Sequence, residues 1–242
     1  MKIVTLPGVF RPISDSWMLA DLLREQTLPP EAAVLDLCTG SGVVALSAAR
    51  RGVRDVTAVD VSRRAVLTVR LNARLNGLRV RALRGELFAP VAGRRFDAIA
   101  CNPPYVPAAS PDLPAAGPAR AWDAGLDGRA VLDRVLDEAP DHLRPGGVVL
   151  VTHSSILGQE ATLRRLEAGG LEADVVARRR GPLGPLMSAR VAMLEERGML
   201  RPGQRHEDVL ILRGRLPRRV RRAVTAATER DGRAAGRAAT PP

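Results

Sequence analysis

The stretch Asn102-Pro103-Pro104-Tyr105 follows an apolar run at residues 95–101 that is typical of a buried strand. Proline fixes φ and lacks a backbone N–H, so the two prolines stiffen the chain after Asn102 and leave its carbonyls facing outward. The Asn102 side chain and a free carbonyl beside it could receive a planar –NH2 group, with Tyr105 as an apolar cover. Ligands of open α/β sheets bind outside the carboxyl ends of the strands. The same residues would also make a turn, so the rest of the chain must decide.

A glycine turn lies between a strand and a helix earlier in the chain. The run at residues 32–37 predicts a strand buried on both faces, and residues 43–49 follow a helical pattern. Between them stands Cys38-Thr39-Gly40-Ser41-Gly42, in the context that allows close approach of a ligand to the backbone. The turn matches neither a dinucleotide fingerprint nor a phosphate loop. Asp36 before it would repel a pyrophosphate and suits a cationic group, such as the ammonium of an amino acid.

Two more predicted strands lead to acidic residues. The strand at residues 55–60 ends in Asp60, where an acid is placed to accept from both hydroxyls of a ribose. A helix at residues 62–76 and a strand at 79–83 follow, and then Glu86 and Leu87. Glu86 could accept from an adenine amino group, and Leu87 offers its backbone N–H. Three acids at successive strand ends around one glycine turn are difficult to explain as unrelated surface charges.

A helix is expected over residues 14–23, with Ser14 or Asp15 as its cap. Ser16 and Trp17 stand at its start, where free N–H groups favour a ligand. A helix that only packs across the domain fits this segment equally well.

The second half of the sequence predicts a mobile loop, three helices and three strands. Their bounds are loop 106–121, helices 129–143, 155–169 and 183–197, and strands 148–153, 171–179 and 207–213, with a turn at 144–147.

The chain has 242 residues and a net charge of +11, which is almost wholly arginine since Lys2 is the only lysine. The last part of the chain is rich in arginine, which predicts disorder or a basic helix near residues 218–227. Such a tail could contact nucleic acid, or could simply be solvated.

Cys38 and Cys101 have neither a zinc-binding spacing nor a disulfide framework around them, so no metal is expected. Without a targeting segment or an apolar run of bilayer length, the chain is expected to be cytoplasmic.

These motifs, in this order and spacing, resemble the class I S-adenosylmethionine-dependent methyltransferases. More narrowly, the chain from about residue 10 to 213 is similar to the HemK-like glutamine methyltransferases that modify peptide-chain release factors. Its start, Phe10-Arg11-Pro12 and Ser14-Asp15-Ser16, looks like the short branch without a helical amino-terminal domain. Cys38 stands where glycine is frequent in the family, Glu86 stands where aspartate is common, and the arginine tail is not part of the family pattern.

The resemblance implies an α/β fold with a Rossmann-like, seven-stranded, mostly parallel sheet, an antiparallel last hairpin strand and helices on both faces. It implies a cofactor-covering segment at residues 1–30, a methyltransferase domain at 31–214 and a basic tail at 215–242. S-adenosylmethionine would be the cofactor, bound by Ser16, Asp36, Cys38, Thr39, Gly40, Gly42, Asp60, Val61, Glu86, Leu87 and Asn102. Asn102, Pro103, Pro104 and Tyr105 would hold the substrate amide, with Asn102, Pro103 and Tyr105 catalytic.

The resemblance also implies a protein substrate of the release-factor type and raises the question of an activator subunit. Adenine and cytosine carry a planar –NH2 as well, and the same Asn-Pro-Pro-Tyr box serves their methyltransferases. The few aromatic residues and the lack of an added recognition domain favour protein glutamine. A small-molecule acceptor is a further alternative, and so is a silent RNA- or ribosome-binding module that keeps the fold.

Overall fold

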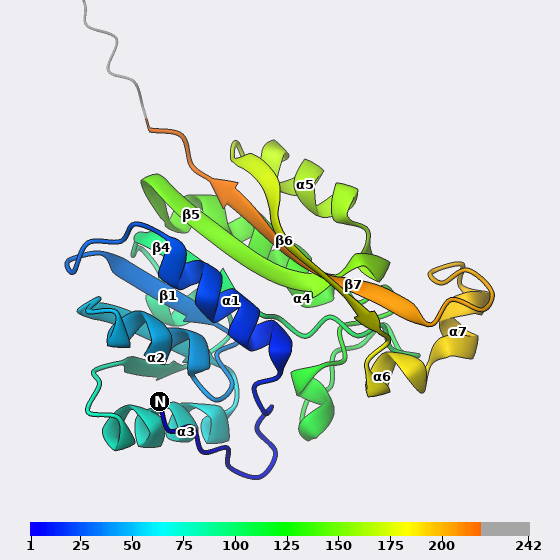
Figure 1. Cartoon of the computed structure of the whole chain (residues 1–242), viewed down its shortest axis with the longest axis horizontal. Helices are drawn as coiled ribbons and strands as arrows, with labels where there is room; N and C mark the ends of the chain where they lie inside the picture. Colours follow the sequence, from blue (N-terminus) through cyan, green and yellow to red (C-terminus); the bar gives the residue numbers. More distant parts are fainter. Residues whose placement is uncertain (219–242) are drawn as a thin grey trace, which may run out of the picture.

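The computed structural model describes residues 1–218, so the predictions made for residues 219–242 lie outside it. Seven strands form one sheet in the order β3-β2-β1-β4-β5-β7-β6 (Figure 1). Their bounds are β1 Ala33–Leu37, β2 Asp55–Asp60, β3 Arg81–Arg84, β4 Phe96–Cys101, β5 Leu143–Ser154, β6 Glu172–Pro182 and β7 His206–Arg215. Only β7 runs antiparallel to its neighbours, β5 and β6. The predicted fold class is confirmed.

Helices cover both faces of the sheet. The helices α1 Ser14–Glu25, α2 Val43–Arg50 and α3 Arg63–Leu75 lie on the face turned to the viewer in Figure 1. The opposite face carries α4 Ala130–Glu138 and α5 Gln159–Ala168, while α6 Pro185–Ser188 and α7 Val191–Glu196 follow the far end of β6. No helix among residues 1–218 is long and apolar enough to cross a membrane.

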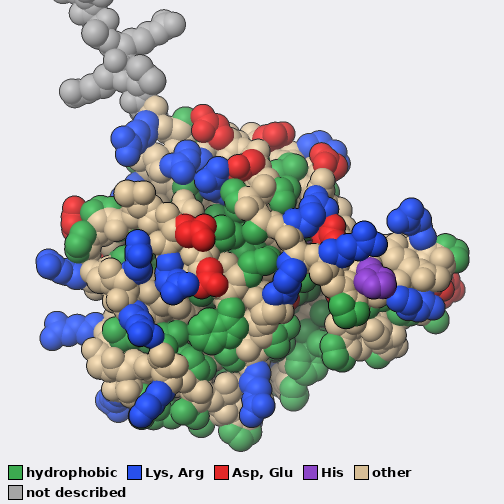
Figure 2. Space-filling model, viewed as in Figure 1, with side chains coloured by type: hydrophobic (Ala, Val, Ile, Leu, Met, Phe, Trp, Pro, Cys, Tyr) green, Lys and Arg blue, Asp and Glu red, His purple; other side chains and the backbone are tan. Residues whose placement is uncertain are grey.

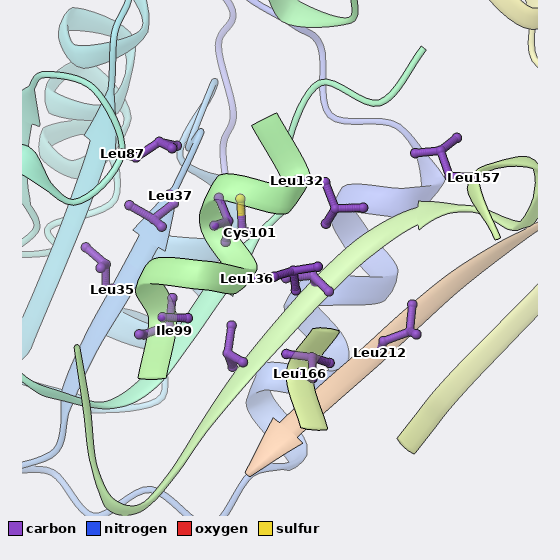
Figure 3. Packing of buried hydrophobic residues seen from close by; sticks show 14 of the residues in the cluster. Leu35, Leu37, Leu87, Ile99, Cys101, Leu132, Leu136, Leu157, Leu166 and Leu212 are labelled. Carbon is purple, nitrogen blue, oxygen red and sulfur yellow. The ribbon is translucent and has the colours of Figure 1, made fainter. Parts of the chain in front are cut away.

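Each face of the sheet has its own apolar core because every central strand is buried on both sides. On the α4 and α5 face, Leu132 and Leu136 of α4 pack near Ile99 and Cys101 of β4 (Figure 3). On the other face, Leu19 and Leu23 of α1 are fully buried. The strands carry Val, Leu and Ala with almost no aromatic residues, as the composition predicts. This double burial makes the sheet a rigid support for side chains at its strand ends.

The turn expected at residues 144–147 is instead part of β5, which runs without a break from Leu143 to Ser154. The register with β4 shifts here, because Phe96 pairs with Leu143 and Ala98 pairs with Val148. Gly147 allows this irregularity. A Cβ there would lie 2.8 Å from the Arg144 carbonyl oxygen and 2.9 Å from that of Phe96, which only glycine tolerates.

The helices expected in the second half are shorter than predicted. Helix α4 ends at Glu138 because Pro140 lacks the N–H that would continue it, and a 3-10 turn, Ala139–His142, replaces the last predicted residues. Gly158, at φ 79°, separates a short 3-10 turn from α5. The helix expected over residues 183–197 is two helices, α6 and α7, because Arg190 between them leaves the helical conformation at φ −115°.

The loop at residues 106–121, expected to be mobile, is held at its start. Val106 donates its backbone N–H to the Trp122 carbonyl at 2.7 Å, and Ala108 donates to the Gly125 carbonyl at the same distance. Arg190 donates to the Pro107 carbonyl at 2.7 Å, an anchor from a distant segment that sequence periodicity does not reveal. The loop is therefore packed at its start and exposed at residues 109–113.

Candidate active site

One cavity of about 1420 Å³ opens at the carboxyl ends of β1, β2 and β4. It is bordered by every residue that the sequence analysis placed in the site except Gly42. The cavity is larger than the roughly 300–1,000 Å³ of ordinary ligand pockets, so it has room for two molecules side by side. It continues from the strand ends past Tyr105 toward Met187 and Glu207.

Gly42 supports the site from behind. Its φ of 83° lies in the left-handed region, and it caps the amino end of α2. A Cβ at this position would stand 2.9 Å from Cγ2 of Val69 on α3. Gly42 therefore allows α2 and α3 to pack closely, which is a structural reason for glycine that the sequence analysis did not separate from ligand approach.

Asp36 is buried at the end of β1 and ties the glycine turn to α2. Its Oδ2 accepts from Thr39 Oγ1 at 2.5 Å and from the Ala45 N–H at 3.0 Å. Burial raises the pKa of Asp36 to about 7, and the nearby Asp60 adds to the rise while the two hydrogen bonds oppose it. A cation beside this carboxyl would favour its ionised form.

Asp60 ends β2 with both carboxylate oxygens turned to backbone donors. Oδ2 accepts from the Gly40 N–H at 2.9 Å and Oδ1 from the Ser62 N–H at 2.8 Å. Burial raises the pKa of Asp60, and these hydrogen bonds work against that rise. Since each carboxylate oxygen has two lone pairs, Asp60 keeps capacity for donors from the cavity, such as ribose hydroxyls.

Glu86 and Leu87 differ in their exposure. The Glu86 side chain is 61% exposed and forms an ion pair with Arg134 of α4 at 2.5 Å. Leu87 is buried and has a φ of 42°, which is uncommon for a branched residue. Both border the cavity, and their adenine contacts stay a prediction.

The Asn102 amide is fixed by α1. Its Nδ2 donates to Ser16 Oγ at 3.2 Å, while its Oδ1 is buried and has no hydrogen-bond partner within residues 1–218. A buried oxygen without a donor costs about 1–3 kcal/mol. The fixed amide orientation leaves that oxygen to receive a donor from a bound molecule. Ser16, at the start of α1, therefore lies in the site, as the functional interpretation of this helix start predicted.

Tyr105 is held by two residues that the sequence analysis did not place in the site. Its hydroxyl donates to Asp15 Oδ2 at 2.5 Å. Arg179 of β6 donates to Asp15 Oδ1 at 2.7 Å and to Ser14 Oγ at 2.5 Å. Burial, with the Asp15 carboxylate, raises the pKa of Tyr105 well above its usual range, so the phenol stays protonated. The sequence indicated Asp15 only as a candidate helix cap, and no pattern in the sequence predicts that Arg179 lies near the site.

Cys38 occupies a left-handed backbone position, with φ at 53°. Glycine adopts this conformation without strain, which fits the expectation from the family resemblance that glycine would stand here. We expect Cys38→Val to unfold more easily than Cys38→Gly by about 1–2 kcal/mol, since a β-branched side chain is disfavoured at positive φ. Urea denaturation of the two variants measures the difference.

The matched control is the same pair of substitutions at Cys101, which is buried inside β4 beside Leu37 of β1. There the order should reverse, because a strand interior favours valine over glycine. The same order at both positions would contradict the strain assigned to Cys38.

Comparison with known proteins agrees with this arrangement. The family described as "methyltransferase small domain" matches residues 1–115. A Methanocaldococcus jannaschii protein named as an N5-glutamine methyltransferase is 33% identical over 187 residues, which cover 77% of this chain and 93% of that protein. A solved Encephalitozoon cuniculi structure, titled as the Mtq2–Trm112 complex responsible for methylation of eRF1, has a TM-score of 0.58 at 23% identity and covers 86% of this chain and 98% of its own.

Bacterial relatives are longer. The ribosomal protein uL3 glutamine methyltransferase of Bradyrhizobium diazoefficiens is 46% identical over 121 residues, 47% of this chain and 38% of that protein. The release factor glutamine methyltransferase of Moorella thermoacetica is 39% identical over 161 residues, 63% of this chain and 57% of that protein. The chain thus spans about two fifths to three fifths of these two proteins.

The fold, with a glycine turn and acids at successive strand ends, is that of a class I methyltransferase. Within that class, the chain belongs to the HemK-like family of protein N5-glutamine methyltransferases.

Proposed function

We propose that this enzyme transfers a methyl group from S-adenosylmethionine to the side-chain nitrogen of a glutamine in a protein, of the Gly-Gly-Gln release-factor type. The observation that carries the proposal is the buried Asn102 Oδ1, which has no partner within residues 1–218. An oxygen held in this way can accept a hydrogen bond from a planar –NH2 group. The names of the relatives, which include release factor and uL3 glutamine methyltransferases, support a protein acceptor.

The volume of the cavity and the acidic residues that line it fit the cofactor. Asp36 would hold the methionine ammonium, Asp60 the ribose, and Glu86 with the Leu87 N–H the adenine, along a wall that also includes Ser16, Thr39, Gly40 and Val61. Asp36 Oδ1 makes no hydrogen bond within the described part of the chain, so one oxygen is available. When bound, S-adenosylmethionine supplies an electrophilic methyl group on a sulfonium.

Asn102, Pro103 and Tyr105 would act by positioning the acceptor amide for methyl transfer. An amide nitrogen is a weak nucleophile because its lone pair is delocalised. Acceptance of its two N–H groups by Asn102 Oδ1 and the Pro103 carbonyl would favour a pyramidal nitrogen and direct its lone pair. Tyr105, locked by Asp15, would pack against the amide and exclude water. The chain then needs no strong general base beside the acceptor, and none of its three histidines borders the cavity.

Asp36 should make cofactor binding depend on pH. A cationic ammonium needs the carboxylate form, so binding expels the proton that Asp36 retains below about pH 7. We expect affinity to fall by about fivefold from pH 7 to pH 6, and Asp36→Asn to bind weakly at both. Calorimetry in buffers of different ionisation enthalpy measures the proton released. A pH-independent affinity for the wild type would exclude this contact.

The same raised pKa has the opposite consequence for stability without cofactor. Between about pH 4 and pH 7 the folded protein keeps a proton that the unfolded chain has lost. The contribution of Asp36 to the free energy of unfolding is therefore greatest below this window and is lost as pH rises through it.

Asp15 should be a positioning residue for Tyr105. We expect Asp15→Asn and Tyr105→Phe each to lower kcat by about tenfold. The double variant should be no worse than Asp15→Asn alone, because both single substitutions disturb the same hydrogen bond and only Asp15→Asn also loses the charge that pairs with Arg179. Steady-state kinetics of the wild type, the two single variants and the double variant measures these changes in kcat. Asp21→Asn, on the exposed side of the same helix, is the control and should change nothing. Additive losses in the double variant would contradict a shared function.

An amino group of a nucleic-acid base is the second candidate, because it is also planar and could reach Asn102. The test offers radiolabelled S-adenosylmethionine with a Gly-Gly-Gln release factor, total RNA and DNA in separate reactions. Label on the release factor, lost when its glutamine is replaced, supports the proposal. Label on RNA or DNA alone would overturn it. The activator subunit implied by the short branch stays a prediction, and its purified form is added in a parallel reaction.

A further inference from the structure

A second hollow lies at the other end of the sheet from the cavity described above. It measures about 450 Å³ and opens at the amino ends of β2 and β3, beside the carboxyl end of α3. Five arginines line it, together with Asp55 and four apolar residues; the arginines are Arg54, Arg70, Arg74, Arg79 and Arg81. The charge of this hollow is what distinguishes it from the rest of the surface.

The arginines of the hollow have little counter-charge. Residues 50–84 contain ten arginines and two aspartates. Asp60 faces the active-site cavity, and Asp55 is bound through both oxygens by Arg94, at 3.0 and 2.8 Å. Within residues 1–218 none of the five makes an ion pair. Among the described residues, Arg70 alone of the five makes a side-chain hydrogen bond, to the Ala82 carbonyl at 3.1 Å.

Outside residues 50–84, eleven of the twenty arginines in residues 1–218 make an ion pair, whereas none of the ten within residues 50–84 does. Arg165 binds Asp137, Arg178 binds Asp208 and Arg213 binds Asp174, each with a shortest contact of 2.6 or 2.7 Å. Figure 2 shows Lys and Arg side chains over α2 and α3 at the lower left of the view, whereas acidic and basic groups alternate near β6 and α5. Of the nineteen arginines in residues 1–218 that make no ion pair, ten thus lie in the single segment 50–84, which includes α3 and β3.

Five guanidinium groups around one hollow repel each other unless an anion lies between them. The planar guanidinium fork matches phosphate oxygens, and five such groups offer more donors than one phosphate can use. No aromatic side chain lines the hollow, so it offers no surface on which a base could stack. We propose that this hollow binds successive backbone phosphates of a nucleic acid, independently of sequence and at a distance from the methyl-transfer site.

The test compares two triple variants of the full chain with the same loss of charge. One carries Arg74→Gln, Arg79→Gln and Arg81→Gln, whose side chains make no hydrogen bond within residues 1–218. The control carries Arg165→Gln, Arg178→Gln and Arg213→Gln, from the ion-paired side. Fluorescence anisotropy measures the affinity for a short labelled RNA, and separately for a DNA of the same length, as salt is varied. Thermal unfolding of both variants is measured in parallel.

We expect the hollow variant to bind at least tenfold more weakly and to lower the slope of log affinity against log salt by about two, as the loss of three phosphate contacts predicts for a single strand. The control should keep a slope near that of the wild type. Equal losses in the two variants, or displacement of the RNA by polyglutamate as readily as by unlabelled RNA, would overturn the proposal. Methylation of a glutamine peptide should be unchanged in the hollow variant, so this result is independent of the proposed function.

Discussion

Asn102→Ala should lower the rate of methyl transfer by about 10²–10³-fold while the affinity for the cofactor product, S-adenosylhomocysteine, changes little. The rate should fall because the substitution removes the buried Oδ1 that we assign to the acceptor –NH2. Binding of the product should persist because the carboxylates of Asp36 and Asp60 stay in place. Single-turnover kinetics with saturating cofactor measures the first quantity, and calorimetry measures the second.

Asn76→Ala is the matched control for this prediction. Asn76, at the end of α3, also binds backbone groups, through the Lys2 N–H at 2.8 Å and the Lys2 carbonyl at 2.7 Å, but it is far from the cavity lining. It should leave turnover within about twofold of the wild type. Wild-type turnover in the Asn102→Ala variant would contradict the assignment of Asn102 to the acceptor site.

Asp60→Ala should weaken cofactor binding by about 10–100-fold, because a charged acceptor contributes about 1.5–3 kcal/mol. Part of the loss in affinity is indirect. In the wild type the Asp60 carboxylate accepts from the backbone N–H groups of Gly40 and Ser62, and the substitution leaves both without this partner. Calorimetric titration with S-adenosylmethionine measures the affinity, and kcat at saturating cofactor should fall much less than the affinity does.

Asp55→Ala is the companion variant, since Asp55 begins the strand that Asp60 ends. It removes an ion pair with Arg94 at the exposed end of β2 and should leave cofactor affinity unchanged. Wild-type affinity in Asp60→Ala would refute the ribose contact. An equal loss in both variants would point to a general weakening of β2.

The sequence predicted the parts of the fold and site that depend on local pattern. The buried strands are rich in Val, Leu and Ala, and the acids and Asn102 stand at or near their ends, where parallel topology must bring them together. Local pattern also explains the errors. Pro140 and Gly158 interrupt helical periodicity that otherwise continues, and the glycines of β5 resemble a turn when they in fact form a strand irregularity.

The contacts that sequence could not predict join residues far apart in the chain. Arg179 reaches Asp15 across 164 positions, and Arg190 anchors the loop at Pro107 from a segment expected to be one helix. Each depends on where β6 and its following helices lie relative to α1, which periodicity does not determine. Sequence also did not predict that Glu86, grouped with the cofactor acids, pairs with Arg134 at the cavity border, and its contact with adenine stays a prediction.

Tandem mass spectrometry of an acceptor protein, after incubation with this enzyme and S-adenosylmethionine, identifies the atom that receives the methyl group. We expect one added methyl group on the side-chain nitrogen of the glutamine in a Gly-Gly-Gln sequence, and at most a trace of it when the Asn102→Ala variant replaces the wild-type enzyme. A methyl group on a lysine, an arginine or a backbone nitrogen of that protein, with the glutamine unmodified, would contradict it.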